Sequence, residues 1–399
     1  MKIAMMVDTY KPHVSGITNA IALNKKLFEA RGHEVFVFTF GDEDYIDDEP
    51  NVVRSPGIPL VDTGYYISLR YNKHARRLLY TMDIAHVHHP FLSGSLAVRY
   101  CRPRNIPIVF TNHTRYDLYA QAYFPLLPET VSETALRAYL PTFCRSCDMV
   151  IAPSNGMRQI LQKIGVDSPV TVIPNGVDLA PFHNSVEPVS REDFGINPQD
   201  VVLMYVGRLG PEKNLPFLLR SFNGAAEAYS FIHLVIVGDG PERDNLVDRV
   251  NHMGMSSRIH FTGMVPYDQL RRYLAMADAF VTASVTEVHP LSIVEAMAAG
   301  LPVLGVDSPG VGDTIEDGVT GYLTSEDLAA YTAKLIRMVT ENDRRRQMGE
   351  EARRVSEQYS IERTTAITLE HYRHLVNHVK TRKRSLRTRL TILLDRWTQ

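Results

Sequence analysis

Short apolar runs alternate with longer stretches of helical periodicity along most of the chain. The runs that indicate strands lie at residues 3–7, 34–40, 84–88, 108–111, 149–152, 170–173, 201–206, 233–237, 258–261, 279–283 and 303–306. Fully apolar runs separated by helices are typical of parallel strands that are buried on both faces of a sheet. The pattern therefore predicts an α/β protein built from doubly wound parallel sheets.

The alternation falls into two halves. A chain of 399 residues is longer than one hydrophobic core usually supports. The strand-like runs pause after Ile173–Asp178, and residues 179–199 are polar with three prolines, as in a linker. We therefore expect a first domain at 1–176, a second domain at 177–359, an amphipathic helix at 360–380 and a basic amphipathic tail at 381–399.

Composition describes an ordinary globular protein, with 44% apolar and 22% charged residues. The net charge of −2 is uneven, because the last twenty residues carry seven basic side chains against Asp395 alone. This distribution argues against general nucleic-acid binding and suggests an anionic surface as a partner. Neither a secretory signal nor a membrane-spanning apolar run is visible, so we expect a cytoplasmic protein.

The stretch Ser284–Leu304 carries the densest candidate chemistry, with carboxylates at Glu287 and Glu295. Apolar residues surround Glu295 in a predicted helix that ends at Gly300. Such a helix is buried, and an ionised carboxylate is rarely buried without a partner. Glu295 is therefore either an acid favoured by the helix dipole or a ligand for substrate hydroxyls.

Three motifs, in this order along the chain, resemble the retaining glycosyltransferases of family 4, which have the GT-B architecture. Asp8–Ile21 is similar to the N-terminal glycine loop of that family, and Val206–Asn214 (VGRLGPEKN) is similar to its diphosphate site. Ser284–Leu304 resembles its donor signature, Glu-x7-Glu. The resemblance covers residues 1–375 and implies two Rossmann-like domains facing a cleft. The first would bind the acceptor and the second a nucleotide-sugar donor, with the helix 360–380 crossing back onto the first.

The resemblance implies roles for particular residues of this chain. The catalytic set would be His113, Arg208, Lys213 and Glu287. Arg208 and Lys213 would stabilise the departing diphosphate, Glu287 would bind hydroxyls of the transferred sugar, and His113 would orient that sugar or stabilise charge. The donor-binding set would be Gly16, Val265, Leu291, Ser292 and Glu295.

The residues themselves give partial support to these roles. Arg208 and Lys213 follow a predicted strand and precede a helix, which places them at the carboxyl edge of a sheet. Cations and helix amides there can stabilise a diphosphate without a metal, although loop cations are often simply solvated. Gly16 follows the first strand, where the lack of a side chain lets a phosphate approach, but a plain turn is the commoner explanation. His113 also follows a strand, and a lone histidine is often structural.

The chain departs from the resembled family at His289-Pro290, where the family usually has Phe-Gly. Because proline has no N–H, one backbone contact to the sugar is either absent or replaced by His289. Retention in the family is explained by front-face substitution, in which the donor phosphate accepts the proton of the acceptor. No residue is therefore expected to act as a catalytic base, and no metal or cofactor is expected to be required.

The acceptor is suggested by residues 64–80, which combine aromatic and aliphatic side chains with four basic residues and no acid. This mixture suits an anionic membrane interface, and the alternative is a surface helix with its apolar face packed. Asp8–Gly16 and Thr111–Asp117 resemble diacylglycerol glucosyltransferases. The resemblance favours transfer of glucose from UDP-glucose to a lipid such as diacylglycerol, in α linkage, at the inner face of the cell membrane.

Other functions are compatible with the same residues. A mannosyltransferase could use GDP-mannose and a phosphoinositide-type lipid, and the acceptor could also be a small soluble molecule. A metal-dependent transferase could use Asp42-Glu43-Asp44, although this acidic tract has the composition of a solvated loop. A non-catalytic nucleotide-sugar sensor or membrane scaffold is the alternative from another class, and product formation would distinguish it.

Overall fold

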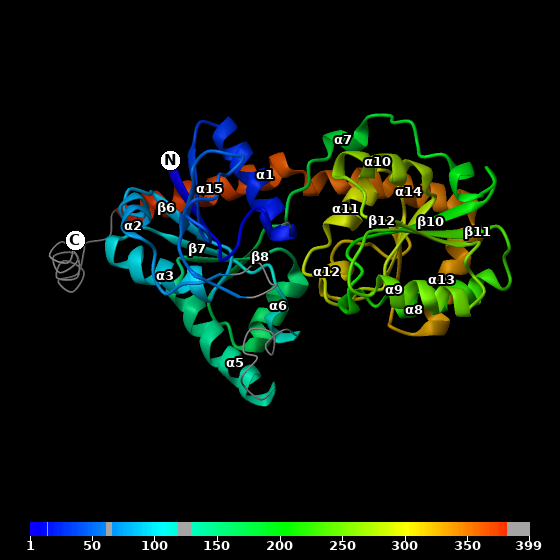
Figure 1. Cartoon of the computed structure of the whole chain (residues 1–399), viewed down its shortest axis with the longest axis horizontal. Coiled ribbons are helices and arrows are strands. Elements are labelled where there is room, and N and C mark those ends of the chain that lie inside the picture. Colours follow the sequence, from blue (N-terminus) through cyan, green and yellow to red (C-terminus); the bar gives the residue numbers. More distant parts are fainter. Residues whose placement is uncertain (14, 61–65, 119–128, 381–399) are drawn as a thin grey trace. The chain divides into compact units, whose positions relative to one another are not determined.

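The chain folds as two compact units in the computed structural model, which describes residues 1–13, 15–60, 66–118 and 129–380 (Figure 1). The first unit comprises Met1–Gly176 together with the helix Ile361–Lys380. The second unit is Val177–Ser360. The expected tail, 381–399, lies outside the described residues.

The first unit contains a seven-stranded parallel sheet in the order β3-β2-β1-β6-β7-β8-β9. Its strands are β1 (Lys2–Met6), β2 (Glu34–Phe40), β3 (Val52–Ser55), β6 (Ile84–Val87), β7 (Ile108–Thr111), β8 (Met149–Ala152) and β9 (Val170–Val172). A short antiparallel pair, β4 (Ile58–Pro59) and β5 (Tyr66–Ile67), stands apart from this sheet. The strands of the main sheet are mostly buried, as expected for a sheet covered on both faces.

Helices cover both faces of the first sheet. They are α1 (Gly16–Ala30), α2 (Lys73–Leu79), α3 (Leu92–Tyr100), α5 (Glu129–Ser146), α6 (Asn155–Ile164) and α15 (Ile361–Lys380). Helices α1 and α15 lie on one face and α3, α5 and α6 on the other (Figure 1). The residues of α15 singled out by their spacing, Leu369, Tyr372 and Val376, are buried in one cluster with Phe28 of α1.

The second unit contains a six-stranded parallel sheet in the order β12-β11-β10-β13-β14-β15. Its strands are β10 (Val201–Val206), β11 (Ile232–Val237), β12 (Ile259–Gly263), β13 (Ala279–Val281), β14 (Val303–Val306) and β15 (Gly321–Thr324). Its helices are α7 (Ala180–His183), α8 (Leu215–Ala226), α9 (Arg243–His252), α10 (Tyr267–Met276), α11 (Leu291–Ala298), α12 (Pro309–Gly312), α13 (Leu328–Thr340) and α14 (Asn342–Ser356). One hydrophobic cluster joins α8, α9 and α13 to the sheet, and another joins α7, α10, α11 and α14 to it.

The expectation of two doubly wound units is confirmed, while two features differ in detail. The short strands β3 and β15 were not predicted, because polar residues or glycine interrupt their apolar runs. The segment 179–199 is less irregular than a linker, since it contains α7 and a 3₁₀ turn at Arg191–Phe194. The sheet orders place a topological switch between β1 and β6 in one unit and between β10 and β13 in the other.

Candidate donor site

The candidate residues of the second unit follow the two strands at its topological switch. Arg208 and Lys213 lie on the segment between β10 and α8, and Glu287 lies on the segment between β13 and α11. Strands β10 and β13 are hydrogen-bonded neighbours. Because parallel strands present their carboxyl ends at one edge, both segments leave the sheet at the same edge.

An ion pair joins these two segments. Lys213 Nζ lies 2.6 Å from Glu287 Oε1, and both side chains are about one-fifth exposed, at 22% and 21%. The spacing of the motifs did not predict this contact, since the residues are 74 positions apart. The pair places a cation and an acceptor of hydroxyl hydrogens side by side, so one end could contact phosphate and the other sugar.

Glycine is required where these segments approach other backbone. A Cβ on Gly310 would lie 2.5 Å from the carbonyl oxygen of Glu287, and the Gly310 amide donates to that oxygen. Gly238, with φ of +139°, would place a Cβ 2.0 Å from the carbonyl oxygen of Gly207, beside Arg208. The backbone positions of Arg208 and Glu287 are therefore fixed by close contacts that a side chain would disrupt.

Glu295 is buried in α11 with 8% of its surface exposed. Its Oε1 accepts a hydrogen bond of 2.9 Å from the hydroxyl of Tyr267, the first residue of α10. Burial raises the pKa of Glu295 to about 7, and the hydrogen bond from Tyr267 opposes this shift. The partner expected for a buried carboxylate at Glu295 is therefore the hydroxyl of Tyr267. The other carboxylate oxygen, Oε2, is left for a ligand.

Leu291 and Ser292 are the first two residues of α11, as expected. The residue before them, Pro290, provides no side-chain cap. The first amides of a helix have no acceptor within it and carry partial positive charge, which suits a phosphate. Two of these amides therefore lie on the element that also carries Glu295.

His289 is turned into the protein. Its side chain is 7% exposed and its ring lies 5.1 Å from the ring of Tyr359, centroid to centroid. Burial lowers the pKa of His289 to about 4, so the ring is neutral at pH 7. Within the described part of the chain neither ring nitrogen has a hydrogen-bond partner. At His289-Pro290, where the chain departs from the resembled family, a buried imidazole thus lies two positions after Glu287.

The remaining candidates of this unit are more peripheral. The side chain of Arg208 is 64% exposed and approaches Glu212 at 4.0 Å. Val265 is partly buried between β12 and α10, where it contacts the cluster that includes α11. Arg208 is free to reorient toward an anion, whereas Val265 can offer its backbone in the segment that leads to Tyr267.

Gly16 and His113 belong to the first unit. Gly16 is the first residue of α1, capped by Ser15, whose hydroxyl accepts from the Thr18 amide. A Cβ on Gly16 would meet no atom within 4 Å, so open space surrounds it. Its conformation does not require glycine, and the absence of a side chain serves access to the helix N-terminus.

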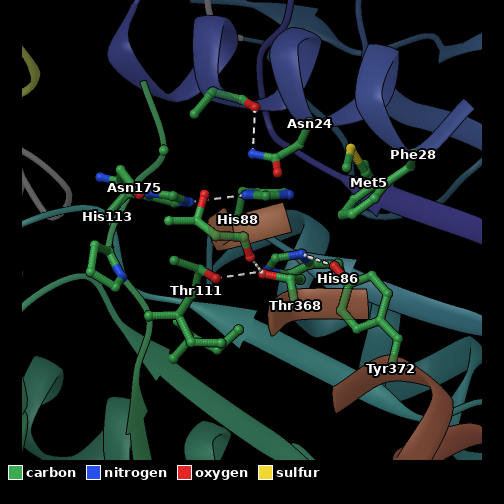
Figure 2. A pocket seen from close by; sticks show the side chains of 16 residues that line it. Met5, Asn24, Phe28, His86, His88, Thr111, His113, Asn175, Thr368 and Tyr372 are labelled. Carbon is green, nitrogen blue, oxygen red and sulfur yellow. Dashed lines mark hydrogen bonds between the residues drawn. The ribbon is translucent and has the colours of Figure 1, made fainter. Parts of the chain in front are cut away.

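His113 follows β7 and is hydrogen-bonded to another histidine (Figure 2). Its Nε2 lies 3.0 Å from Nδ1 of His88, and the two rings are stacked with an interplanar angle of 18°. Burial lowers the pKa of His113 to about 3, with the nearby histidines His86 and His89 adding to the shift. His113 is therefore neutral at pH 7, which favours an orienting role over charge stabilisation.

A hydrogen-bonded series connects this region to α15. The Tyr372 hydroxyl bonds to His86 Nδ1, and His86 Nε2 bonds to the Thr111 hydroxyl (Figure 2). The His86 ring lies 4.3 Å from the His88 ring. His88 Nε2 has no hydrogen-bond partner in the described residues and borders a cavity of ≈ 40 Å³, large enough for a water molecule.

The structure adds Tyr267 and His88 to the candidate residues. Nothing in the spacing of Tyr267 pointed to Glu295, because the contact joins the first residue of α10 to the middle of a separate helix, α11. His88 did carry a signal, since His86, His88 and His89 sit at the carboxyl end of a predicted strand. Residues at this end of a parallel strand face the ligand-binding edge of the sheet.

The region expected to contact membranes divides into two environments. Tyr71 is buried and stacks on Phe40, so it belongs to the core. Ile67 and Leu69 are exposed, at 40% and 77%, and Ile67 pairs with the exposed Ile58 across β4 and β5. We call Ile58, Ile67 and Leu69 the hairpin patch. Exposed Arg70, Lys73 and Arg77 follow it along the chain, and Tyr65 lies outside the described residues.

The acidic stretch at residues 41–50, which contains Asp42-Glu43-Asp44, is partly bound to the rest of the protein by ion pairs. Asp47 forms a buried ion pair with Arg54, and Glu49 contacts Lys11 and Lys25. Asp42, Glu43 and Asp44 are exposed. In the described residues no group of three or more metal-ligating side chains is placed to share an ion.

Family comparisons match both units. The description "Glycosyltransferase Family 4" matches residues 14–181, and "Glycosyl transferases group 1" matches residues 186–355. An alpha-monoglucosyldiacylglycerol synthase of Acholeplasma laidlawii is 31% identical over 337 residues, covering 80% of this chain and 84% of that protein. A GDP-mannose-dependent alpha-mannosyltransferase of Corynebacterium glutamicum is 29% identical, covering 81% and 76%.

Solved structures resemble the same fold. Anabaena Alr3699/HepE, in complex with UDP and glucose, matches with a TM-score of 0.72 and 20% identity. The match covers 93% of this chain and 99% of that protein. At this identity the likeness supports the fold alone.

Proposed function

The chain belongs to glycosyltransferase family 4, and we propose that it transfers glucose from UDP-glucose to a lipid acceptor with retention of configuration. Membership makes the protein a hexosyltransferase with the GT-B fold. The observation that carries the proposal is the Lys213–Glu287 ion pair at the switch between β10 and β13. It lies in a chain that matches an alpha-monoglucosyldiacylglycerol synthase over most of both lengths.

The donor would be held by three kinds of group in the second unit. Glu295 would accept hydrogen bonds from the ribose hydroxyls, and the first amides of α11 at Leu291 and Ser292 would bind the phosphates. Val265 would contact the base through its backbone. Glu287 would accept hydrogen bonds from hydroxyls of the glucose, and the neighbouring Lys213 would contact the phosphates.

The reaction would break the bond between glucose C1 and the diphosphate oxygen and form a bond from C1 to the acceptor oxygen. The acceptor loses its proton to an oxygen of the departing diphosphate, so no protein base is needed. Lys213 and Arg208 would stabilise the negative charge that accumulates on the leaving group. Neutral His113 would orient the sugar through a hydrogen bond, and Gly16 would leave the start of α1 open to phosphate.

No metal ion is expected to take part. The stabilising charges come from the arginine and lysine side chains and from helix amides, which suffice in principle for a diphosphate. Activity that persists in excess EDTA would support this expectation, and loss of activity that Mg²⁺ restores would contradict it.

The acceptor is proposed to be diacylglycerol in an anionic membrane. The hairpin patch provides exposed apolar side chains, and Arg70, Lys73 and Arg77 provide adjacent positive charge. None of the helices in the described part of the chain is both long and apolar enough to cross a membrane. Because of the hairpin patch and the positive charge beside it, we propose peripheral association with the inner face of the cell membrane.

Mannosyl transfer from GDP-mannose is the second candidate. It is favoured by the similarity to the mannosyltransferase of Corynebacterium glutamicum and by the His289-Pro290 departure next to the sugar-binding Glu287. The discriminating experiment incubates the full chain with UDP-glucose or GDP-mannose, each with and without vesicles that contain diacylglycerol. We expect glucosyldiacylglycerol to form when UDP-glucose and vesicles are both present, and no lipid product to form from GDP-mannose. A mannosylated lipid as the main product would overturn the donor assignment.

A further inference from the structure

A second hollow lies on the second unit, at the edge of the sheet opposite the donor site. It is lined by Asp278, which precedes β13, and by Pro302, which precedes β14, so it lies at the amino ends of these strands. Its volume is ≈ 550 Å³, within the usual range for small-molecule sites. Leu274, Ala277 and Leu301 supply apolar lining, and α14 supplies charged residues.

Three arginines of α14 line this pocket, and two are held by backbone carbonyls. Arg345 Nη1 donates to the carbonyls of Met338 and Val339, at 3.0 and 3.2 Å. Arg353 donates from Nε and Nη2 to the carbonyls of Ala298 and Ala299, at 3.2 and 3.0 Å. Both guanidinium groups are thus oriented in advance, which lowers the entropic cost of binding a ligand. Arg346 is exposed beside them.

The positive charge in the pocket is incompletely balanced. Among the described residues Arg345, Arg346 and Arg353 form no ion pair, whereas the next arginine of α14, Arg354, pairs with Glu351. Two carboxylates also line the pocket. Asp278 is already engaged by Arg191 at 2.9 Å and by the Val202 amide, and Glu350 is exposed.

Neighbouring arginines also repel Arg345. Burial lowers the pKa of Arg345; the charge of Asp278 opposes this shift, and the charges of Arg191 and Arg346 add to it. A dianion between these groups would relieve the repulsion and accept the guanidinium hydrogens that the carbonyls leave unused. A planar guanidinium group can donate two parallel hydrogen bonds to two oxygens of one phosphate, which makes the contact especially strong.

We propose that this pocket binds a small phosphate monoester, with the phosphate on Arg345, Arg346 and Arg353 and a short carbon body on the apolar lining. A dianionic phosphate matches a pocket lined by three guanidinium groups better than a single carboxylate does. The pocket is separate from the donor site, since the two lie at opposite edges of the same sheet.

The pocket is also connected to the donor site through α11. Arg353 binds the carbonyls at the last turn of this helix, and Glu295 lies one turn earlier on it. A phosphate that draws Arg353 away would change the hydrogen bonding of that turn. We therefore expect an occupied pocket to alter donor affinity, a consequence that rests on the proposed function of Glu295.

The test uses sn-glycerol 3-phosphate as the probe with the full chain, measured by calorimetry in chloride buffer with saturating UDP. We expect saturable binding at one site, competition by inorganic phosphate and none by glycerol. Arg346→Gln changes an exposed side chain and should weaken binding of the probe at least tenfold. Arg345→Gln should weaken it as much. Arg354→Gln is the matched control on α14 and should bind the probe normally.

The outcomes separate the pocket from the donor site. Absence of binding to both the soluble probe and the vesicles, normal binding in Arg346→Gln, or binding that UDP abolishes would overturn the proposal. A phosphatidic acid vesicle arm distinguishes a lipid headgroup from a free metabolite: binding of vesicles but not of the soluble probe, lost in Arg346→Gln, would assign the pocket to the lipid. A probe that binds while Glu295→Ala retains full UDP-glucose affinity would reject the donor assignment and leave the pocket intact.

Discussion

Among the single residues of the candidate site, Glu295 shows most clearly how burial changes the protonation of a side chain. Its pKa is raised to about 7 by burial, so near pH 7 the free protein is a mixture of acid and carboxylate. Only the carboxylate accepts hydrogen bonds from two ribose hydroxyls without holding a proton of its own. Binding of the donor should therefore favour the carboxylate and lower this pKa.

The resulting prediction concerns the pH dependence of UDP-glucose binding, since the diphosphate of this ligand keeps its charge in this range. Affinity should rise with pH up to about 7 and level off above it, because a donor that binds below that pH must first displace a proton. The slope below the midpoint should approach about tenfold per pH unit. Calorimetry in buffers of different ionisation enthalpy should detect the released proton.

Two variants control this prediction. Glu295→Gln should bind UDP-glucose more weakly, by about 1.5–3 kcal/mol, and without the inflection near neutral pH. Tyr267→Phe removes the hydrogen bond that stabilises the carboxylate, so the inflection should move to higher pH. An inflection that stays in place in Glu295→Gln would assign the titration to another group.

The sequence located most single residues but could not pair them. The apolar surroundings of Glu295 predicted its burial, and the structure confirms it. The partners Tyr267 and Lys213 depend on how separate segments leave the sheet, which no local pattern encodes. The sequence likewise identified His289 as a departure from the resembled family. Only the structure shows that its side chain points inward against Tyr359.

At the scale of elements, α15 is more than a connection at the end of the chain. Tyr372 on this helix bonds to His86 on β6, and His88 lies between His86 and His113. Periodicity predicted α15 and its buried face, because Leu369, Tyr372 and Val376 recur at helical spacing. It could not predict the hydrogen bond, since α15 and β6 are 286 residues apart at this contact.

His88 is predicted to position His113 without touching the substrate. His88→Ala should lower kcat by about tenfold, the usual cost of one orienting hydrogen bond near 1.5 kcal/mol. UDP-glucose affinity should change little, because the donor-binding residues other than Gly16 lie in the second unit. Single-turnover transfer rates, compared with equilibrium binding, separate the two effects.

The control for this prediction is conservative replacement. His88→Asn keeps a hydrogen-bonding group near the position of Nδ1 and should recover most of the rate. His88→Ala combined with His113→Ala should be no slower than His113→Ala alone, because the two histidines act as one unit. His374→Ala, an exposed histidine on α15, should match the unaltered protein. Additive losses in the double variant would contradict the positioning role.

At the scale of the whole molecule, the proposed acceptor requires attachment to a membrane. The sequence suggested two basic and apolar regions, residues 64–80 and the tail 381–399. The structure retains the first in reduced form, because Tyr71 is in the core while the hairpin patch is exposed. The tail remains a prediction from sequence.

Vesicle flotation tests this attachment. Binding to anionic vesicles should weaken with salt, since each basic residue near the surface contributes about 1 kcal/mol that salt screens. Leu69→Ser and removal of 381–399 should each weaken binding at least tenfold. The matched control is Leu328→Ser, an exposed leucine of the second unit with 43% of its surface accessible. Equal flotation of all four proteins would contradict membrane docking by these regions.

We propose that the segments following β10 and β13 perform the transfer, and replacement of Lys213 is the sharpest test of this role. The measurement is the single-turnover rate of glucose transfer from UDP-glucose to diacylglycerol in vesicles, for Lys213→Ala against Lys334→Ala. Lys334 also forms a carboxylate pair on this unit, with Asp317, and is the matched control. We predict that Lys213→Ala loses about 10²–10³ in rate with a smaller loss of donor affinity, while Lys334→Ala keeps both. A near-normal rate in folded Lys213→Ala would show that these segments do not perform the transfer.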